Sequence, residues 1–225
     1  MVTEGLVFCL DGINNTGSGH DPSSSVWKDT VGGTDIPIQG LEWTNKAIKN
    51  GSASVVDLSF MPSQSLSDAF ANGFTICVTS NFDQWSRGNV IKLVGLDPTT
   101  DNKNYVSMSA ANRGWTTTLT SSTFLSTNPA TAVDVQRGVE AKRTVSIVGI
   151  QGYKVCGMTH SMQTGETSVV VNNNVYQYSG ISSQQMSIYV PQYGRINHVA
   201  IYNRVLTYAE MEQNRAYLVN RFFAS

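Results

Sequence analysis

The sequence is poor in charged residues, which make up 14% of its 225 positions, against about 25% in an average soluble protein. Neither sign of charge dominates, because 15 Lys and Arg stand against 16 Asp and Glu, for a formal net charge of -1. Without a basic excess to neutralise phosphates, we expect no nucleic-acid partner. Ser, Thr and Asn are frequent instead, which is typical of strands, turns and surfaces solubilised by hydroxyls and amides.

Cysteine and long apolar runs are also scarce. Cys9, Cys77 and Cys156 are three in number and form no CxxC pair, so neither a disulfide framework nor a zinc site is indicated. Each lies in an apolar stretch, which favours a buried thiol. No stretch approaches the roughly 18 apolar residues of a membrane span, so we expect no membrane insertion. The amino terminus has no basic segment and only a short apolar run, so we expect synthesis in a reducing cytosol without a signal peptide.

Short β-rich runs recur along the chain, separated by clusters of Gly, Asn, Asp, Ser and Pro. This spacing is typical of a sandwich or barrel. No linker, internal repeat or charge run divides the sequence, so we expect one domain over residues 1–225. Residues 12–25 lack an apolar period and predict a long loop, and residues 116–131 fit either an edge strand or a loop.

Alternation within FTICVTSNF predicts a half-buried strand with Phe74, Ile76, Val78 and Ser80 on one face. VSIVGIQGYKVCGM predicts a hairpin that turns at Gln151–Gly152. TSVVVNNNVYQY predicts a second hairpin, because Asn tolerates the left-handed turn conformation.

The carboxyl end carries the signals of a helix. Thr207 as N-cap and Glu210 three residues later form a capping box, in which each side chain satisfies a backbone amide. Leu206 before the cap and Met211 after it fit a hydrophobic staple. Met211, Arg215, Leu218 and Phe222 then follow at helical spacing, and Val219 widens this mostly apolar stripe.

The same end resembles a known family. GRINHVAIYNRVLTYAEMEQNRAYL is similar to the closing motif of laminin-G-like jelly rolls, within the concanavalin A-like lectin and glucanase superfamily. The positions that carry this likeness are Gly194, Ile196, Val199, Ile201, Tyr202, Asn203, Arg204, Leu206, Thr207 and Glu210. Trp27 and Asp29 match an early W-x-D element, and residues 5–29 resemble the start of such domains in tailed-phage virion proteins.

The resemblance implies an all-β fold, a two-sheet antiparallel jelly-roll sandwich of concanavalin A-like type with a short C-terminal helix that crosses one end of the sandwich. It also implies a non-enzymatic phage virion protein, used for structure, decoration or contact with host-surface glycans. Its partners would be other virion proteins and host glycans, a homo-oligomer is compatible, and its location would be the virion. The alternative is a bacterial carbohydrate-active enzyme or its carbohydrate-binding module, extracellular or at the cell surface.

Catalytic machinery is not evident in the sequence. Glycosidases need two carboxylates across the scissile bond, and paired carboxylates on one strand stand two or four residues apart. None of the six glutamates has such a partner on an expected strand. No G-x-S-x-G elbow occurs, and His20, His160 and His198 have no evident partner residue. We therefore expect a protein that is not an enzyme.

Sugar recognition uses an aromatic face with planar hydrogen-bonding groups beside it. The sequence offers six candidates in turn-rich settings, with packing in the core or at an edge as the alternative for each: Trp85, Arg87, Arg113, Trp115, Tyr189 and Tyr193. Trp27 and Trp43 fall at family-like strand positions, so we expect both in the core.

Many relatives hold a calcium ion between loops, but no ligand set in this sequence matches theirs. The densest oxygen cluster, Asp97 and Asp101 with Asn102 and Asn104, fails the EF-hand pattern because Lys103 stands at a ligand position. A solvated turn explains the cluster, with a metal site as the alternative. We expect no cofactor, while calcium on ligands that the sequence does not identify stays the open alternative.

This expectation predicts that a chelator such as EDTA leaves the melting temperature nearly unchanged. No side-chain cluster supplies the six or more oxygens that calcium prefers. Thermal unfolding with and without chelator checks it, and a loss of about ten degrees would contradict it, since such a shift needs roughly 2 kcal/mol or more of linked binding.

Overall fold

The structure is a computed structural model that describes residues 1–66, 73–82, 88–96, 103–111, 114–121, 124–129, 141–150, 154–161, 167–172, 185–190, 192–204 and 206–223. Only the backbone is described at residues 73–74, within the strands from Ser80 to Gln185, and at four positions of the C-terminal helix.

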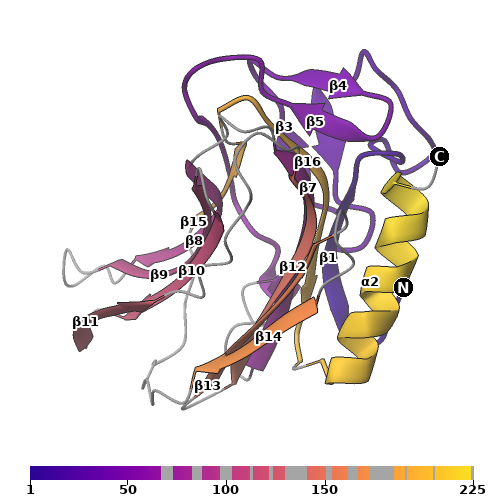
Figure 1. Cartoon of the computed structure of the whole chain (residues 1–225). Helices are drawn as coiled ribbons and strands as arrows, with labels where there is room; N and C mark the ends of the chain where they lie inside the picture. Colours follow the sequence, from indigo (N-terminus) through magenta and orange to yellow (C-terminus); the bar gives the residue numbers. More distant parts are fainter. Residues whose placement is uncertain are drawn as a thin grey trace.

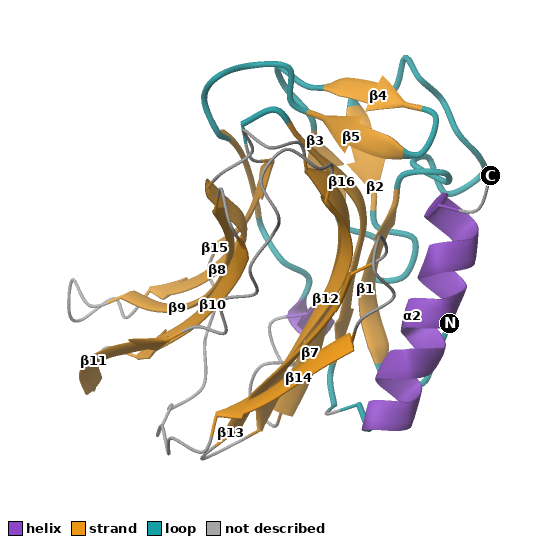
Figure 2. Ribbon diagram, viewed as in Figure 1, coloured by secondary structure: helices purple, strands orange, loops and turns teal. Residues whose placement is uncertain are grey.

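The described strands form three antiparallel sheets (Figures 1 and 2). The eight-stranded sheet runs in the order β14 (Thr167–Asn172), β13 (Lys154–Ser161), β12 (Ala141–Ile150), β7 (Gly73–Phe82), β16 (Gly194–Tyr202), β5 (Ala47–Lys49) and β4 (Glu42–Thr44), and β1 (Leu6–Asp11) also pairs with β16. The six-stranded sheet runs in the order β11 (Phe124–Pro129), β10 (Gly114–Ser121), β9 (Lys103–Ala111), β8 (Gly88–Leu96), β15 (Gln185–Val190) and β6 (Val56–Phe60). A small sheet joins β2 (Val26–Lys28) and β3 (Asp35–Pro37).

The two large sheets face each other across one apolar core. Ile76 and Val78 of β7 meet Ile188 of β15 in a single cluster of fully buried side chains. Phe8 of β1 stacks on Phe60 of β6, with the ring centroids 5.7 Å apart. The expected two-sheet antiparallel arrangement is therefore present.

The C-terminal helix α2 (Tyr208–Phe223) lies along the outer face of the eight-stranded sheet as a third layer (Figure 2). The sequence had predicted a helix across one end of the sandwich, and that placement is wrong. The physical reason is that the outer face of β7 and β16 is itself apolar, with Cys77, Ala200 and Tyr202 buried there. Three side chains of the predicted stripe cover them: Met211, Leu218 and Phe222.

The central strand β7 is consequently buried on both faces. Ile76 and Val78 face the six-stranded sheet, while Thr75, Cys77 and Thr79 lie on the other face, and all five are at most 1% exposed. The prediction of a half-buried strand is wrong for this reason.

The predicted helix start is confirmed in detail. The Thr207 amide donates to Glu210 Oε2 at 2.8 Å, and the Glu210 amide donates to Thr207 Oγ1 at 3.3 Å. Leu206 and Met211 are both buried, as a staple requires. Arg204 donates to both carboxylate oxygens of Glu210, at 3.1 and 2.6 Å, and this pairing, followed by the bonds from Thr207, lowers the pKa of Glu210 to about 2.

A buried polar network under α2 links the two ends of the chain. The Val2 amide donates to Asn214 Oδ1 at 2.7 Å, and Asn214 Nδ2 donates to the Tyr202 hydroxyl at 2.9 Å. The Tyr202 hydroxyl donates to the Val2 carbonyl at 3.1 Å and so closes the ring of bonds. Burial, the largest cause, raises the pKa of Tyr202.

A second polar contact fixes the far end of α2. Arg221 Nε donates to Asp11 Oδ2 at 2.7 Å, and Asp11 Oδ1 accepts from the amides of Ile13 and Asn14. His198 is buried beside this pair, and its Nδ1 has no hydrogen-bond partner among the described residues. Burial lowers the pKa of His198 to about 4, so the ring is neutral at pH 7.

The other predicted elements have mixed outcomes. β12 and β13 form the expected hairpin, with Ile150 opposite Lys154. Of residues 116–131, only β11 is the edge strand that was one of the two alternatives, because β10 pairs with β9 as well as β11 and is not at the edge. Residues 12–25 form a loop, as predicted. The second half of the Asn-rich hairpin and most of the Asp97 cluster lie outside the described residues. In the described part of the chain, no helix is long and apolar enough to cross a membrane.

We predict that Leu218→Ala lowers the free energy of unfolding by about 2–5 kcal/mol, because it leaves a cavity under α2. Tyr217→Ala is the matched control, since Tyr217 is 39% exposed on the same turn, and should cost less than about 1 kcal/mol. Urea denaturation checks both variants. Equal, small effects would contradict the docking of α2 on this sheet.

His198 predicts a pH dependence of stability. Its pKa is about 4 in the folded protein and about 6.5 when unfolded, so the unfolded state binds the proton first. The contribution of neutral His198 to the free energy of unfolding is fully present above about pH 6.5. As the pH falls toward 4, this contribution of about 3 kcal/mol is lost. His198→Gln should flatten this part of the curve of unfolding free energy against pH. His20→Gln, at a half-buried loop position, should keep it; an unchanged curve in His198→Gln would refute the assignment.

Candidate functional site

Among the residues that the structure describes, Cys9 and His198 form a pair that resembles an activated nucleophile. Cys9 Sγ lies 3.5 Å from His198 Nε2, a distance at which a thiol and a base can interact. Burial, the largest cause in each case, raises the pKa of Cys9 to about 12 and lowers that of His198 to about 4. Both groups are therefore neutral, and both are buried. A buried neutral thiol of this kind packs as a small apolar group.

Asp29, from the W-x-D element, has a structural task. Its Oδ1 accepts from the amides of Cys9 and Val31, both at 3.0 Å, and its Oδ2 accepts from the Thr34 amide at 3.4 Å. The carboxylate thus ties β1 to the loop that connects β2 and β3. Within the described residues, no three His, Cys, Asp or Glu side chains gather as a metal site would need.

The six sequence-predicted sugar residues are only partly within the described structure. Trp85, Arg87 and Arg113 lie outside the described residues, and Trp115 is placed by its backbone alone, opposite Ala110 in the β9–β10 pair. These four candidates remain predictions.

Tyr189 and Tyr193 lie on either side of the corner that leads from β15 to β16. Tyr189 is half-buried on the outer face of the six-stranded sheet, opposite Asp57, because its neighbours Ile188 and Val190 point into the core. Tyr193 is 41% exposed and has a φ of 51°, an uncommon backbone conformation for an aromatic residue. Tyr189 is half-buried and Tyr193 is exposed. The geometry of the two rings therefore does not by itself indicate a shared sugar site.

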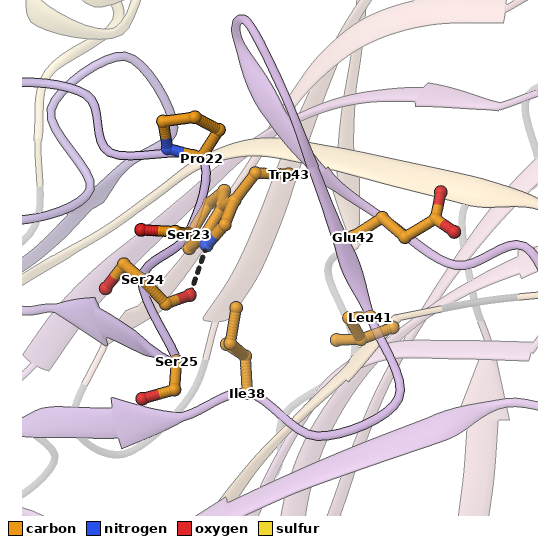
Figure 3. Close-up of a pocket in the computed structure, with 8 residues that line it drawn as sticks. All are labelled: Pro22, Ser23, Ser24, Ser25, Ile38, Leu41, Glu42 and Trp43. Atoms are coloured by element: carbon orange, nitrogen blue, oxygen red, sulfur yellow. Dashed lines mark hydrogen bonds between the residues drawn. The ribbon is translucent and has the colours of Figure 1, made fainter.

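An open pocket of about 450 Å³ lies beside Trp43 (Figure 3). Its described lining residues are Pro22, Ser23, Ser24, Ser25, Ile38, Leu41, Glu42 and Trp43. They come from two segments: the end of the long loop before β2, and the connection from β3 to β4 together with the first two residues of β4. In Figure 3 the indole lies against the serine segment, while the Glu42 carboxylate points away from the ring.

The indole of Trp43 is held in place from two sides. Its Nε1 donates to the Ser24 carbonyl at 2.8 Å, drawn as the dashed line in Figure 3. Its ring meets the fully buried Trp27 edge to face, with the centroids 5.5 Å apart and the planes at 89°. His20 makes a second edge contact, at 6.2 Å. The ring is therefore fixed without a ligand.

Side-chain bonds hold the serine segment in position as well. Asn15 is buried, its Nδ2 donates to the Asp21 carbonyl and its Oδ1 accepts from the Asp21 amide, both at 2.8 Å. Asp21 Oδ1 accepts from both the amide and the hydroxyl of Ser23, at 2.8 and 2.7 Å. These bonds from Ser23 lower the pKa of Asp21, so its carboxylate is ionised at neutral pH.

The pocket combines a fixed aromatic ring, hydroxyl groups and an open mouth, which is a set of groups suited to a sugar. The expectation that Trp27 is in the core is confirmed. Trp43 is only half-buried: it packs against the core cluster and also lines the pocket. Sequence reasoning assigned it to the core alone. The only sequence signal for the pocket was the run of three serines at 23–25. The contact of this run with Trp43 is between separate segments, so the run alone did not predict it.

No known family model matches this sequence, and no curated protein matches it either. Solved structures do match. Trypanosoma rangeli sialidase in complex with sialic acid aligns with a TM-score of 0.63 and 17% identity, over 94% of this chain and 32% of that one. The binding domain of botulinum neurotoxin DC in complex with SialylT aligns with a TM-score of 0.65 and 15% identity, over 95% of this chain and 52% of that one.

A further receptor-binding domain aligns with a TM-score of 0.67 and 12% identity, over 95% of this chain and 51% of that one. The chain thus spans about a third to a half of the length of these structures. At such identities the likeness concerns the fold alone. The likeness extends over nearly the whole chain and supports the expected antiparallel jelly-roll fold.

Proposed function

We propose that this chain is a non-enzymatic glycan-binding module of a tailed-phage virion, with Trp43 as the platform for the sugar. The observation that carries the proposal is the fixed, half-buried indole at the mouth of an open pocket lined by three serines. The apolar side of a pyranose packs on such a ring, and hydroxyl groups beside it accept or donate hydrogen bonds.

The pocket has the size and rigidity that this role needs. Its volume of about 450 Å³ falls within the range of roughly 300–1,000 Å³ typical of small-ligand sites. Because Trp27 and the Ser24 carbonyl already hold the indole, binding does not have to order that side chain, which lowers its entropic cost.

The structural neighbours support a glycan as the ligand class. The sialidase structure was solved with sialic acid and the neurotoxin binding domain with SialylT. Those ligands belong to those proteins, and the fold alone does not determine the function of this one. Their bearing on this chain is that sugars are bound by proteins built on the same fold.

The virion role is supported by the sequence. The opening segment resembles phage virion domains, and the sequence is rich in Ser, Thr and Asn. Cys9 is buried and is not in a disulfide, which suits a protein made in a reducing cytosol. In this role its partners are other virion proteins, further copies of itself and host-surface glycans.

A lack of catalysis is part of the proposal. Among the described lining residues Glu42 is the only carboxylate, and hydrolysis of a glycosidic bond needs two that flank the bond. We therefore expect the pocket to hold a sugar without cleaving it.

A second candidate is a bacterial carbohydrate-active enzyme or its carbohydrate-binding module. It is favoured by the match of this chain to 32% of the sialidase chain. Assembly of the purified protein into particles supports the virion role. Turnover of a polysaccharide above a heat-killed control supports the enzyme.

We predict that Trp43→Ala weakens binding to the best glycan on an array by at least about tenfold, because the stacking platform is lost. Trp43→Phe should retain part of the affinity, since it keeps a ring at the same place. Tyr193→Ala, which removes an exposed ring at another corner, is the control and should bind like the parent. Titration calorimetry on folded variants checks this, and a loss in Tyr193→Ala but not in Trp43→Ala would move the site to the β15–β16 corner.

A further inference from the structure

Resting on the proposed function, we infer that the Trp43 pocket selects neutral and amino sugars and discriminates against acidic ones such as sialosides and uronates. This selectivity differs from that suggested by the sialylated ligands of the structural neighbours. It follows from two separate properties of the pocket, its supply of hydrogen-bond donors and its charge.

The side-chain donors of Trp43, Ser23 and Ser24 already make hydrogen bonds within the protein. The Trp43 indole N–H donates to the Ser24 carbonyl. The Ser23 hydroxyl donates to Asp21 at 2.7 Å, and the Ser24 hydroxyl donates to the Val26 carbonyl at 2.7 Å. What these two serines still offer to a ligand is the lone pairs of their oxygens.

His20 adds to this pattern. Its Nδ1 lies 3.0 Å from the Gly12 carbonyl, which can only accept, so Nδ1 carries the proton. In the neutral ring the remaining Nε2 is then an acceptor. The described groups near Trp43 therefore present mainly acceptors, with the Ser25 hydroxyl still adaptable. Sugar hydroxyls and ammonium groups can donate to them, whereas a carboxylate is acceptor-only.

The charge near the pocket has the same consequence. The described lining includes no Lys or Arg. Two carboxylates are close: Asp21, bonded directly to the Ser23 hydroxyl, and Glu42, whose side chain is 75% exposed. Both repel an incoming carboxylate, although water screens them.

One cation near the pocket, Lys49, is already paired with one of these acids. Lys49 Nζ lies 3.9 Å from Glu42 Oε2, across the β4–β5 pair. Arg195 stands beside Lys49, one strand further from Glu42. Asp21 forms no salt bridge with a Lys or Arg in the described part of the chain, so no such cation neutralises its negative charge at the lip of the pocket.

The experiment compares glycans that differ only in the acidic group. The parent protein is titrated with lactose and 3′-sialyllactose, and an array supplies further neutral, amino and uronate pairs. We expect each acidic member to bind at least about fivefold more weakly than its neutral counterpart. This difference in affinity, called the gap below, should shrink in 0.5 M salt.

The double variant Asp21→Asn, Glu42→Gln removes both charges with little change in shape. It should narrow the gap by roughly three- to tenfold. Glu4→Gln is the matched control, since its side chain is 88% exposed and pairs with Arg204 near the start of α2; it should leave the gap unchanged.

The outcomes separate the inference from the proposal beneath it. Equal or tighter binding of the sialylated member overturns the selectivity, and a difference in affinity that the double variant does not change overturns the role assigned to the charges of Asp21 and Glu42. Glycan binding stands in both cases. Binding to no glycan on the array overturns the proposed function, and the inference falls with it. A gap that narrows in the double variant and not in Glu4→Gln supports both the proposed function and the selectivity.

Discussion

Two strands at the centre of the eight-stranded sheet are buried on both faces, and the rest of the molecule is arranged to meet that need. The inner face of β7 and β16 is covered by the six-stranded sheet, but their outer face carries Cys77, Ala200 and Tyr202. Leaving such a face in water would cost about 25 cal/mol for each Å² of apolar surface. The helix α2 is the layer that removes it from water, so it is an integral part of the fold.

The docking of α2 also reaches the candidate site through a short series of contacts. Arg221 bonds to Asp11 at the end of β1, and Asp11 accepts the amides that begin the long loop. Further along, Asn15 forms two hydrogen bonds with the backbone of Asp21 in the same loop. The Ser24 carbonyl of this loop accepts the hydrogen bond from the indole of Trp43. A surface loop without secondary structure is held by buried partners at each end, which explains how it can present a rigid pocket.

Local signals in the sequence were sufficient for local structure. The capping box, the staple and the stripe at Leu218 and Phe222 all depend on contacts within one segment, and each is found. The face on which α2 docks includes Cys77 of β7, which is distant in the sequence. The polar network of Asn214 depends on Val2, 212 positions away. The same limit applies to Trp43, whose neighbours Ser24 and Trp27 come from other segments. Of the predicted sugar residues, only Tyr189 and Tyr193 have described side chains, and neither lies in the pocket's lining.

The central claim, that Trp43 is the contact for a sugar, can be tested on the indole signals in a ¹H–¹⁵N correlation spectrum. The chain has four tryptophans, and Trp43→Phe identifies the signal of Trp43 by its loss. Trp27 provides an internal reference, because its Nε1 is buried with no hydrogen-bond partner among the described residues. We predict that a bound glycan shifts the Trp43 signal in proportion to saturation and leaves that of Trp27 nearly unmoved. A saturating glycan that moves another indole signal while that of Trp43 stays in place would contradict the account.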